Sequence, residues 1–326
     1  MFSRVHLRFP FFDADLSSPL SPGPGAPVHF LQGVLGSMFT LCHLHDSISR
    51  DVVEKTNQSN LTARSRRVVD ECRAVAGYSL GELTALVIAG TMTFEDGLRV
   101  VAERGVAMGQ ASLERPGGML TVGIRMGTSS TAIDAACQAA RDHCIAEMGT
   151  TRPVCQLASY LYPGVRVIAG DDKALKYIQS NAASFGLTRP IRLPVSGAFH
   201  TDMMASAVGA LDRTLETISL VHPRIPVIAN VTAKRYGHGP SIRKNLLKQL
   251  IQPVLWEQTM TALYQRPQQT NFPISLEVGP GGQLGMALRK TNRKAWFEQD
   301  CSLLPTGSPS PFPPNLPATG TAFGSF

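Results

Sequence analysis

The stretch of residues 74–90 constrains the fold more than any other part of the sequence. A short apolar run leads into Gly77-Tyr-Ser79-Leu-Gly81, and an apolar segment ending at Gly90 follows. A strand, a sharp turn with small residues around a serine, and a helix are typical of a nucleophile elbow. Because that turn sets the serine at a helix N-terminus, backbone N–H groups and the helix dipole favour a developing oxyanion. The pattern predicts Ser79 as a nucleophile; the alternative is a tight turn whose serine merely caps the helix.

The order of elements after the elbow predicts an α/β fold with two parts. Thr93, with Asp96 three residues on, resembles a capping box that opens the next helix. A β-α-β-β-α-β order typical of a ferredoxin-like unit follows. Its expected elements are strands at MLTVGI, VCQLASYL, VRVIAG and TRPIRLPV, and helices at 131–147 and 172–184.

Strands and helices alternate again in the last part of the chain. Helices are expected at 201–218, 241–250 and near 257–265, and strands at IPVIANV and SLEVG. Because strands that alternate with helices form mostly parallel sheets, we expect a parallel α/β core interrupted by the ferredoxin-like lobe.

The expected domain limits follow composition and element order. Residues 68–117 and 195–297 are assigned to the core, and residues 118–194 to the small lobe. Residues 1–67 form an atypical N-terminal segment, in which 17–27 are nearly all Ser, Pro and Gly and indicate a linker. Residues 298–326 are expected to be a disordered Pro-rich tail, because 301–326 contain no charged residue.

A serine nucleophile needs a base, and His200 is the strongest candidate among eight histidines. It follows a predicted strand and precedes a helix, and catalytic groups gather at strand ends in α/β folds. A structural histidine is the alternative. Arg104, on the helix after the elbow, could pair with a substrate carboxylate through two N–H groups, or could be a solvated arginine.

Composition narrows the classes of function. Lys and Arg number 31 against 24 Asp and Glu, a net charge of +7, but the basic clusters are not interleaved with aromatic residues. Nucleic-acid binding is therefore disfavoured, and a small anionic substrate or an acidic partner fits the charge. No apolar run is long enough to span a membrane. The six cysteines form no C-x-x-C pair, and Glu277-Val-Gly-Pro-Gly-Gly lacks the Lys of a P-loop. We therefore expect no metal and no nucleotide cofactor.

Longer motifs recur along the chain in a fixed order. They are GYSLGELTAL around Ser79, AERGVAM around Arg104, GGML from Gly117, PVSGAFH ending at His200, Asn230-Val, KQL around Gln249, PVLW ending at Trp256, and EVGPG from Glu277. On these motifs, residues 68–297 resemble the malonyl-CoA:acyl carrier protein transacylases, in particular the mitochondrial animal form. The family fold is an α/β-hydrolase-like core with an inserted ferredoxin-like lobe.

The resemblance implies a mechanism for the pair predicted above. Ser79 would attack the thioester of malonyl-CoA with His200 as general base, giving a malonyl ester and free CoA. The phosphopantetheine thiol of acyl carrier protein would then take the malonyl group. Arg104 would bind the malonyl carboxylate, which an acetyl group lacks.

The resemblance also assigns supporting roles. Gln249 falls on the position that helps to orient the histidine through a carbonyl oxygen. The backbone N–H of Leu80 would be one oxyanion donor, and Phe199 is the residue that precedes the histidine in malonyl-type members. The implied partners are malonyl-CoA and acyl carrier protein, with no cofactor, no nucleic acid and no membrane. The implied location is the mitochondrial matrix, and residues 1–12 carry two arginines and no acid, which is compatible with a transit peptide.

One departure from the family leaves two alternatives open. The family begins with a strand and a Gly-Gln-Gly-Ser-Gln motif that supplies a second oxyanion N–H, and residues 1–67 contain no such motif. Because the loss of one oxyanion donor can cost about 10²–10³ in rate, a catalytically impaired relative is one alternative. A serine thioesterase is the other.

Overall fold

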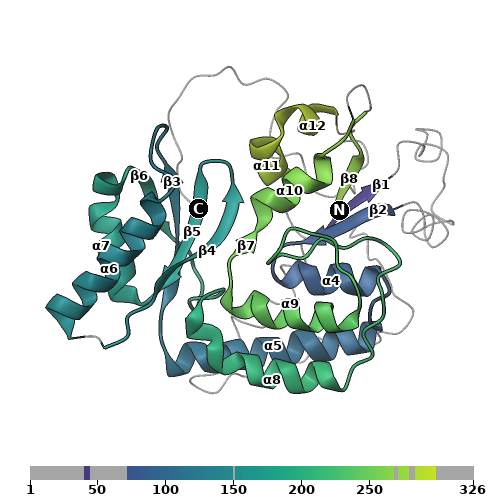
Figure 1. Cartoon of the computed structure of the whole chain (residues 1–326), viewed down its shortest axis with the longest axis horizontal. Coiled ribbons are helices and arrows are strands. Elements are labelled where there is room, and N and C mark those ends of the chain that lie inside the picture. The colour runs from purple at the N-terminus through teal and green to yellow at the C-terminus, as the bar shows by residue number, and fades with distance from the viewer. Residues whose placement is uncertain (1–39, 45–71, 150, 268–270, 279–282, 299–326) are drawn as a thin grey trace, which may run out of the picture.

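The computed structural model describes residues 40–44, 72–149, 151–267, 271–278 and 283–298. Two sheets lie side by side, each with its own helices (Figure 1). The expected N-terminal linker and most of the expected tail lie outside the described residues.

The core sheet has three described strands, in the order β2 (Cys72–Gly77), β1 (Thr40–Leu44), β8 (Ile274–Val278). β1 pairs antiparallel with both neighbours, so β2 and β8 run in the same direction. The α/β class is confirmed, but the expected parallel core is a mixed sheet in the described part. The reason is β1, which comes from the N-terminal segment and lies between the two strands that the sequence pattern indicated.

A further segment extends this sheet without forming a strand. Val75 pairs in parallel with Val227 in a single bridge, in which Val75 N donates to Pro226 O at 2.8 Å. The sequence predicted a strand at 225–231. The prediction was too long because Pro226 has no N–H to continue a ladder.

The core helices are α4 (Leu80–Ile88), α5 (Phe94–Glu114), α8 (Ala205–Glu216), α9 (Gly239–Ile251), α10 (Trp256–Tyr264), α11 (Gln283–Thr291) and α12 (Arg293–Glu298). Helices α4 to α10 lie where the sequence pattern expected them, and α11 and α12 were not among the expected elements. Thr93 caps α5, since its hydroxyl accepts from Asp96 N at 3.1 Å. Helices α4, α5, α8 and α9 are stacked on one side of the core sheet (Figure 1). Between them lies the largest apolar cluster, which includes Leu83, Leu86 and Leu211.

The ferredoxin-like lobe is confirmed in order and pairing. Its elements are β3 (Gly118–Ile124), α6 (Ala132–Met148), β4 (Cys155–Tyr162), β5 (Val165–Gly170), α7 (Asp172–Asn181) and β6 (Leu187–Arg192). The strands lie in the order β6-β3-β5-β4 and are antiparallel. A two-residue strand, β7 (Val254–Leu255), joins this sheet beside β4 and links it to the core.

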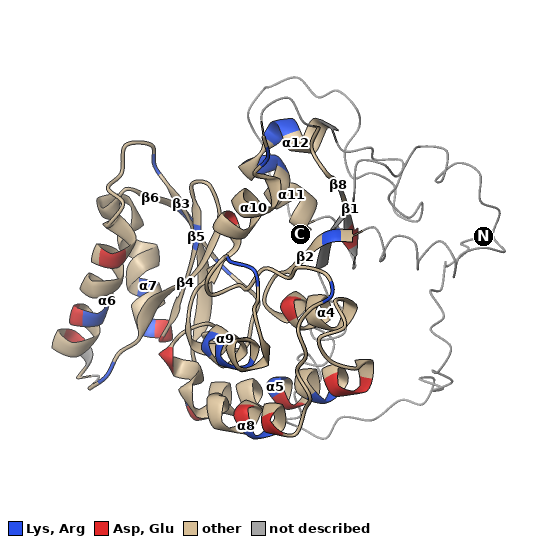
Figure 2. Ribbon diagram, turned by 45° about the vertical axis from the view of Figure 1, so that its right-hand side comes forward, with Lys and Arg blue, Asp and Glu red and all other residues tan. Residues whose placement is uncertain are grey.

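Charged residues gather on the outer helices and leave the strands largely free of them (Figure 2). Helices α5, α6 and α8 carry residues of both signs of charge. No helix in the described ranges has the length and apolar character needed to cross a bilayer.

Candidate active site

A sharp turn between β2 and α4 presents Ser79. Its φ of 52° and ψ of −102° lie outside the regions that most residues adopt, and α4 begins at the next residue. A Cβ built on Gly77 would lie 2.0 Å from the carbonyl carbon and oxygen of Gly81. Because no side chain fits there, this turn requires glycine at position 77. The geometry is that of the nucleophile elbow predicted from the sequence.

His200 reaches the serine from the other side of the site. Its Nε2 lies 2.9 Å from Ser79 Oγ, and its Nδ1 lies 2.6 Å from the backbone oxygen of Gln249. A carbonyl oxygen only accepts hydrogen bonds, so we assign the ring proton to Nδ1, which leaves Nε2 as the acceptor for the serine proton. The histidine is 4% exposed. The site thus has a nucleophile, a base and an orienting group, the last being a backbone carbonyl in place of a carboxylate.

Arg104 brings a buried cation to the same point. From α5, its Nη2 donates to Ser79 Oγ at 3.0 Å and to Gln249 Oε1 at 3.1 Å. Its Nε is buried and has no acceptor among the described residues. The residue is 7% exposed. The solvated helix-face arginine that the sequence left open is therefore excluded.

A buried carboxylate lies beneath the elbow. Glu82 on α4 is 1% exposed, and its Oε1 accepts from Asn230 N at 2.8 Å and from Tyr236 Oη at 2.7 Å. Its Oε2 accepts from Gln249 Nε2. Because three donors converge on one carboxylate, Glu82 ties α4 to the loop of Asn230 and to α9.

Asn230 also holds the elbow directly. Its Oδ1 accepts from Ser79 N at 2.7 Å, and its Nδ2 donates to Gly77 O at 2.8 Å. One amide side chain therefore bridges the two sides of the strained turn.

Burial shifts the pKa values of the three ionisable groups of the site, His200, Glu82 and Arg104. Desolvation and, next, the charge of Arg104 lower the pKa of His200 to about 4, although its bond to Gln249 opposes this. Desolvation raises the pKa of Glu82 to about 7 against its hydrogen bonds, and lowers the pKa of Arg104 to about 10 against the attraction of Glu82. The imidazole is therefore neutral at neutral pH, as a general base requires.

The structure brings four of the six predicted site side chains into one hydrogen-bonded cluster: Ser79, His200, Arg104 and Gln249. Leu80 contributes its backbone N–H, the first of α4, which donates to no acceptor among the described residues. The Phe199 ring is half-buried against the main apolar cluster.

Sequence reasoning assigned no role to Glu82, Asn230 or Tyr236. The available signal was a single acidic residue in the otherwise apolar helix LGELTALVI. A carboxylate that must be buried with such a helix needs polar partners, and these come from positions 148 and more residues away.

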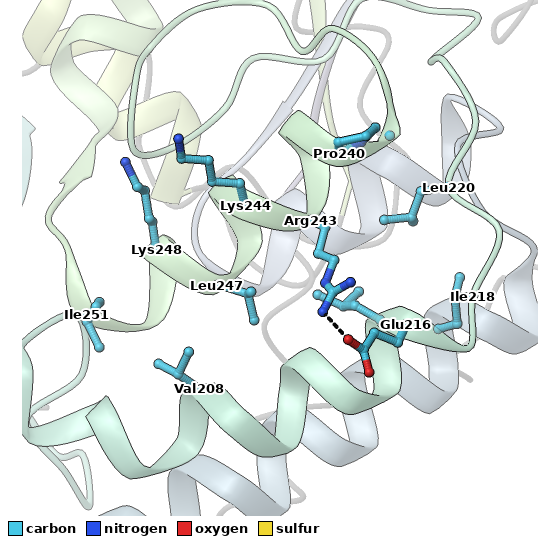
Figure 3. A pocket seen from close by; sticks show the side chains of 12 residues that line it. Val208, Glu216, Ile218, Leu220, Pro240, Arg243, Lys244, Leu247, Lys248 and Ile251 are labelled. Carbon is cyan, nitrogen blue, oxygen red and sulfur yellow. Dashed lines mark hydrogen bonds and ion pairs between the residues drawn. The ribbon is translucent and has the colours of Figure 1, made fainter.

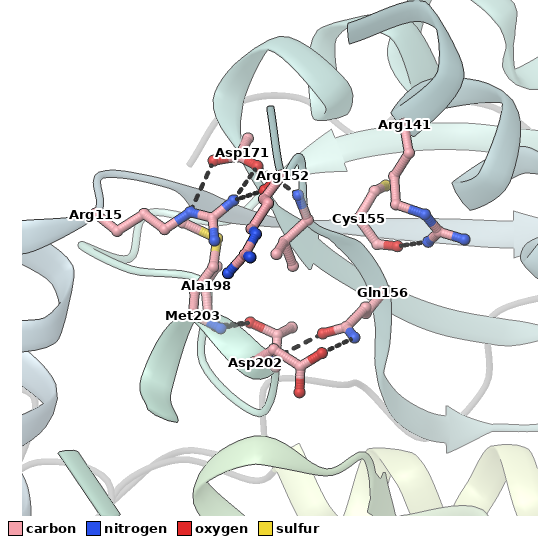
Figure 4. A network of polar contacts seen from close by, with 11 residues as sticks. Arg115, Arg141, Arg152, Cys155, Gln156, Asp171, Ala198, Asp202 and Met203 are labelled. Carbon is pink, nitrogen blue, oxygen red and sulfur yellow. Dashed lines mark hydrogen bonds and ion pairs between the residues drawn. The ribbon is translucent and has the colours of Figure 1, made fainter. Parts of the chain in front are cut away.

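A polar network joins the small lobe to the segment that carries His200 (Figure 4). Gln156 on β4 and Asp202 form a reciprocal pair, in which Gln156 Nε2 donates to Asp202 Oδ2 at 2.6 Å and Asp202 N donates to Gln156 Oε1 at 2.9 Å. Arg115, after α5, donates to Asp171 Oδ2 at 2.9 Å. These contacts fix the two lobes next to the histidine.

A groove of about 700 Å³ lies elsewhere, between α8 and α9 (Figure 3). Val208, Leu247 and Ile251 give it an apolar lining, and Arg243 on α9 pairs with Glu216 on α8 at 2.7 Å. Neither Ser79 nor His200 lines this groove. Within the described ranges no group of three His, Cys, Asp or Glu side chains could hold a metal ion.

A serine on a nucleophile elbow, hydrogen-bonded to a neutral histidine, defines the class of enzymes that form acyl esters on serine. Comparison with known proteins specifies the family. Residues 70–310 match the family model "Acyl transferase domain". The chain is 45% identical over 229 residues to the mitochondrial malonyl-CoA-acyl carrier protein transacylase of Homo sapiens, a match that covers 70% of this chain and 58% of that protein.

Two further relatives agree. The malonyl CoA-acyl carrier protein transacylase of Bacillus subtilis is 31% identical over 243 residues, covering 74% of this chain and 69% of that protein. The solved structure of the same enzyme from Coxiella burnetii superposes with a TM-score of 0.59 at 29% identity, covering 68% of this chain and 65% of that one. The chain therefore belongs to the acyl transferase domain family and, within it, to the malonyl-CoA-acyl carrier protein transacylases. It spans less than two thirds of the length of its human relative.

Proposed function

We propose that the protein transfers a malonyl group from malonyl-CoA to the phosphopantetheine thiol of acyl carrier protein, in fatty-acid biosynthesis. One observation carries the proposal: Ser79 Oγ lies 2.9 Å from the base His200 and 3.0 Å from the buried cation Arg104. A nucleophile in contact with both groups suits a short acyl chain that ends in a carboxylate.

In the first half-reaction, Ser79 Oγ attacks the thioester carbonyl carbon while His200 Nε2 takes the hydroxyl proton. The tetrahedral intermediate then collapses, the C–S bond breaks, and the imidazolium returns the proton to the sulfur of CoA. The hydrogen bond from Nδ1 to Gln249 O keeps the ring aligned and stabilises its transient positive charge. The product of this step is a malonyl ester on Ser79.

The second half-reaction runs the same steps with a new thiol. His200 takes the proton of the phosphopantetheine thiol, the sulfur attacks the ester carbon, and the Ser79 C–O bond breaks with return of the proton to Oγ. Free CoA leaves before the carrier protein reacts, so the kinetics are ping-pong. Both half-reactions balance with these side chains and the two substrates, and we propose that no cofactor takes part.

Arg104 supplies the preference for a dicarboxylic acyl group. Its buried Nε donor lacks an acceptor in the described structure, and a buried unpaired donor costs about 1–3 kcal/mol. A malonyl carboxylate satisfies the guanidinium, whereas an acetyl group leaves it unpaired. Since Nη2 already lies at hydrogen-bond distance from Oγ, the carboxylate it binds belongs to a short chain.

The Leu80 N–H is the proposed oxyanion donor. It begins α4 directly after the nucleophile, where the helix dipole adds to the hydrogen bond. Residues 1–67 lack the Gly-Gln-Gly-Ser-Gln motif with which the family supplies a second donor, and we assign no second donor. We propose that Phe199, which precedes His200, corresponds to the phenylalanine found before the histidine in family members that use malonyl groups.

The partners and location follow from the relatives. The matched proteins from human, mouse and fly are named as mitochondrial and as acting with malonyl-CoA and acyl carrier protein. We therefore propose acyl carrier protein as the acceptor and the mitochondrial matrix as the location. A thioesterase is less well supported, because a buried cation beside the nucleophile favours a carboxylated acyl group.

The intact mass of the protein after brief exposure to malonyl-CoA tests the proposal, with acetyl-CoA as the control. A malonyl ester that disappears when carrier protein is added supports transfer. An ester that water removes equally fast without carrier protein supports the thioesterase. A folded protein that gains no ester would be the catalytically impaired relative.

A further inference from the structure

We propose that Glu82 is a positioning residue for acyl selectivity: through the Gln249 side chain, it aims Arg104 at the substrate carboxylate. The inference rests on the proposed transfer of a malonyl group to Ser79. Glu82 itself contacts neither Ser79 Oγ nor His200, so its effect on the reaction passes through Gln249.

The Gln249 amide has one orientation that satisfies all its neighbours. Its Nε2 donates to Glu82 Oε2 and to Ser79 O, the latter at 2.9 Å, and its Oε1 accepts from Arg104 Nη2 at 3.1 Å. A reversed amide would turn its oxygen toward two acceptors and its NH₂ group toward the guanidinium donor. An ionised carboxylate only accepts hydrogen bonds, so Glu82 enforces the orientation that presents an acceptor to Arg104.

Glu82 is itself held in place. Asn230 N and Tyr236 Oη both donate to Oε1, which leaves Oε2 for Gln249. Glu82 is 1% exposed, so bulk solvent has little access to these hydrogen bonds. The hydrogen bonds from Glu82 through Gln249 to Arg104 therefore hold the guanidinium in position before substrate binds.

Gln249 separates two tasks within one residue. Its backbone oxygen orients His200, and its side chain orients Arg104. A change that moves only the side chain should alter the choice of acyl group and leave the base aligned. This separation gives the inference a readout that a general loss of structure would not produce.

The test compares Ser79 acylation by malonyl-CoA and acetyl-CoA in competition, read by intact mass at pH 8.5. Glu82→Asp keeps the charge but withdraws the carboxylate by one methylene from Gln249. We expect the malonyl-to-acetyl ratio to fall roughly tenfold, the lower end of what a charged hydrogen bond contributes. Glu95→Asp is the matched control, because it makes the same change at an exposed glutamate in the first turn of α5, and the ratio should stay unchanged.

A double variant tests the route. With Arg104→Met already present, Glu82→Asp should leave the remaining ratio unchanged, because the residue through which it acts is gone. Gln249→Leu, which keeps the backbone oxygen, should lower the ratio like Glu82→Asp. The midpoint of thermal unfolding shows whether each variant is folded. If Glu82→Asp is not folded, the malonyl-to-acetyl ratio of Gln249→Leu tests the route through the Gln249 side chain.

The outcomes separate the two proposals. A wild-type protein that forms no malonyl ester overturns the proposed function and this inference with it. A wild-type protein that forms the ester, with variants whose malonyl and acetyl rates fall by the same factor, overturns the inference alone, because Glu82 then supports the elbow as a whole.

Discussion

Replacement of Arg104 by methionine tests the assignment of this buried cation. The variant keeps a long side chain of similar reach and removes the guanidinium. We expect discrimination between malonyl and acetyl groups to fall, because the malonyl carboxylate would enter a buried site without a partner. Hydrogen bonds to charged groups contribute about 1.5–3 kcal/mol, which corresponds to a loss of roughly 10-fold to 150-fold.

The structure supports the upper part of that range for two reasons. Arg104 is 7% exposed, so little water can solvate a carboxylate that has lost it. Its Nε also has no acceptor in the described structure, so a substrate carboxylate can form a hydrogen bond with Nε without breaking an existing one.

The assay exposes each protein to an equimolar mixture of malonyl-CoA and acetyl-CoA and measures the two esters by intact mass. Arg99→Met is the matched control, since Arg99 lies on the same helix with 57% of its side chain exposed. A ratio that is the same in both variants would refute the reasoning and remove Arg104 from the acyl site. A second readout is independent of selectivity: since Arg104 lowers the pKa of His200, its loss should move the acid limb of the acylation rate to higher pH.

Three further outcomes are expected. Ser79→Ala should abolish the ester, and an undiminished adduct in the mass spectrum would place the nucleophile elsewhere. In wild type, acylation needs neutral His200, whose pKa is lowered to about 4. Initial rates with acetyl-CoA, which has no carboxylate for Arg104 and so does not depend on ionised Glu82, should therefore hold as pH falls through 6.5 and halve only near 4, whereas a midpoint near the ordinary histidine value would contradict the burial argument. Gly77→Ala should destabilise the fold by several kcal/mol, because its methyl group would meet the Gly81 backbone; Gly109→Ala, with nothing within 4 Å, should not, and equal melting temperatures would count against the elbow geometry.

The sequence predicted most of what is local in this molecule. The elbow around Ser79 could be recognised because strand, glycines and helix follow one another within a few residues. The small lobe could be recognised for a similar reason, since its alternation of apolar strands and amphipathic helices is continuous from β3 to β6. The roles suggested for Ser79 and His200 needed only a base near a nucleophile, and the structure places the two in contact.

What the sequence missed depends on contacts between distant segments. The position of β1 could not be predicted, because its segment carries little pattern and its place is set by pairing with β8. Burial of Glu82 was equally hidden, since a glutamate on a helix is normally solvated and its partners, Asn230 and Gln249, lie far along the chain. The expected strand at 225–231 failed for a local reason, the missing N–H of Pro226.

The pairing of β1 with β8 has a consequence for how the chain folds during synthesis. In this pair Leu41 on β1 lies opposite Glu277 on β8, far along the chain. This part of the core sheet therefore closes only after the ribosome has released residues beyond 278. The small lobe is one uninterrupted stretch and can fold while the later core strand is still being made. For that interval one edge of β1 lacks its partner, and an unpaired strand edge invites association with other chains. Chaperone demand should therefore peak late in translation and fall once β8 docks.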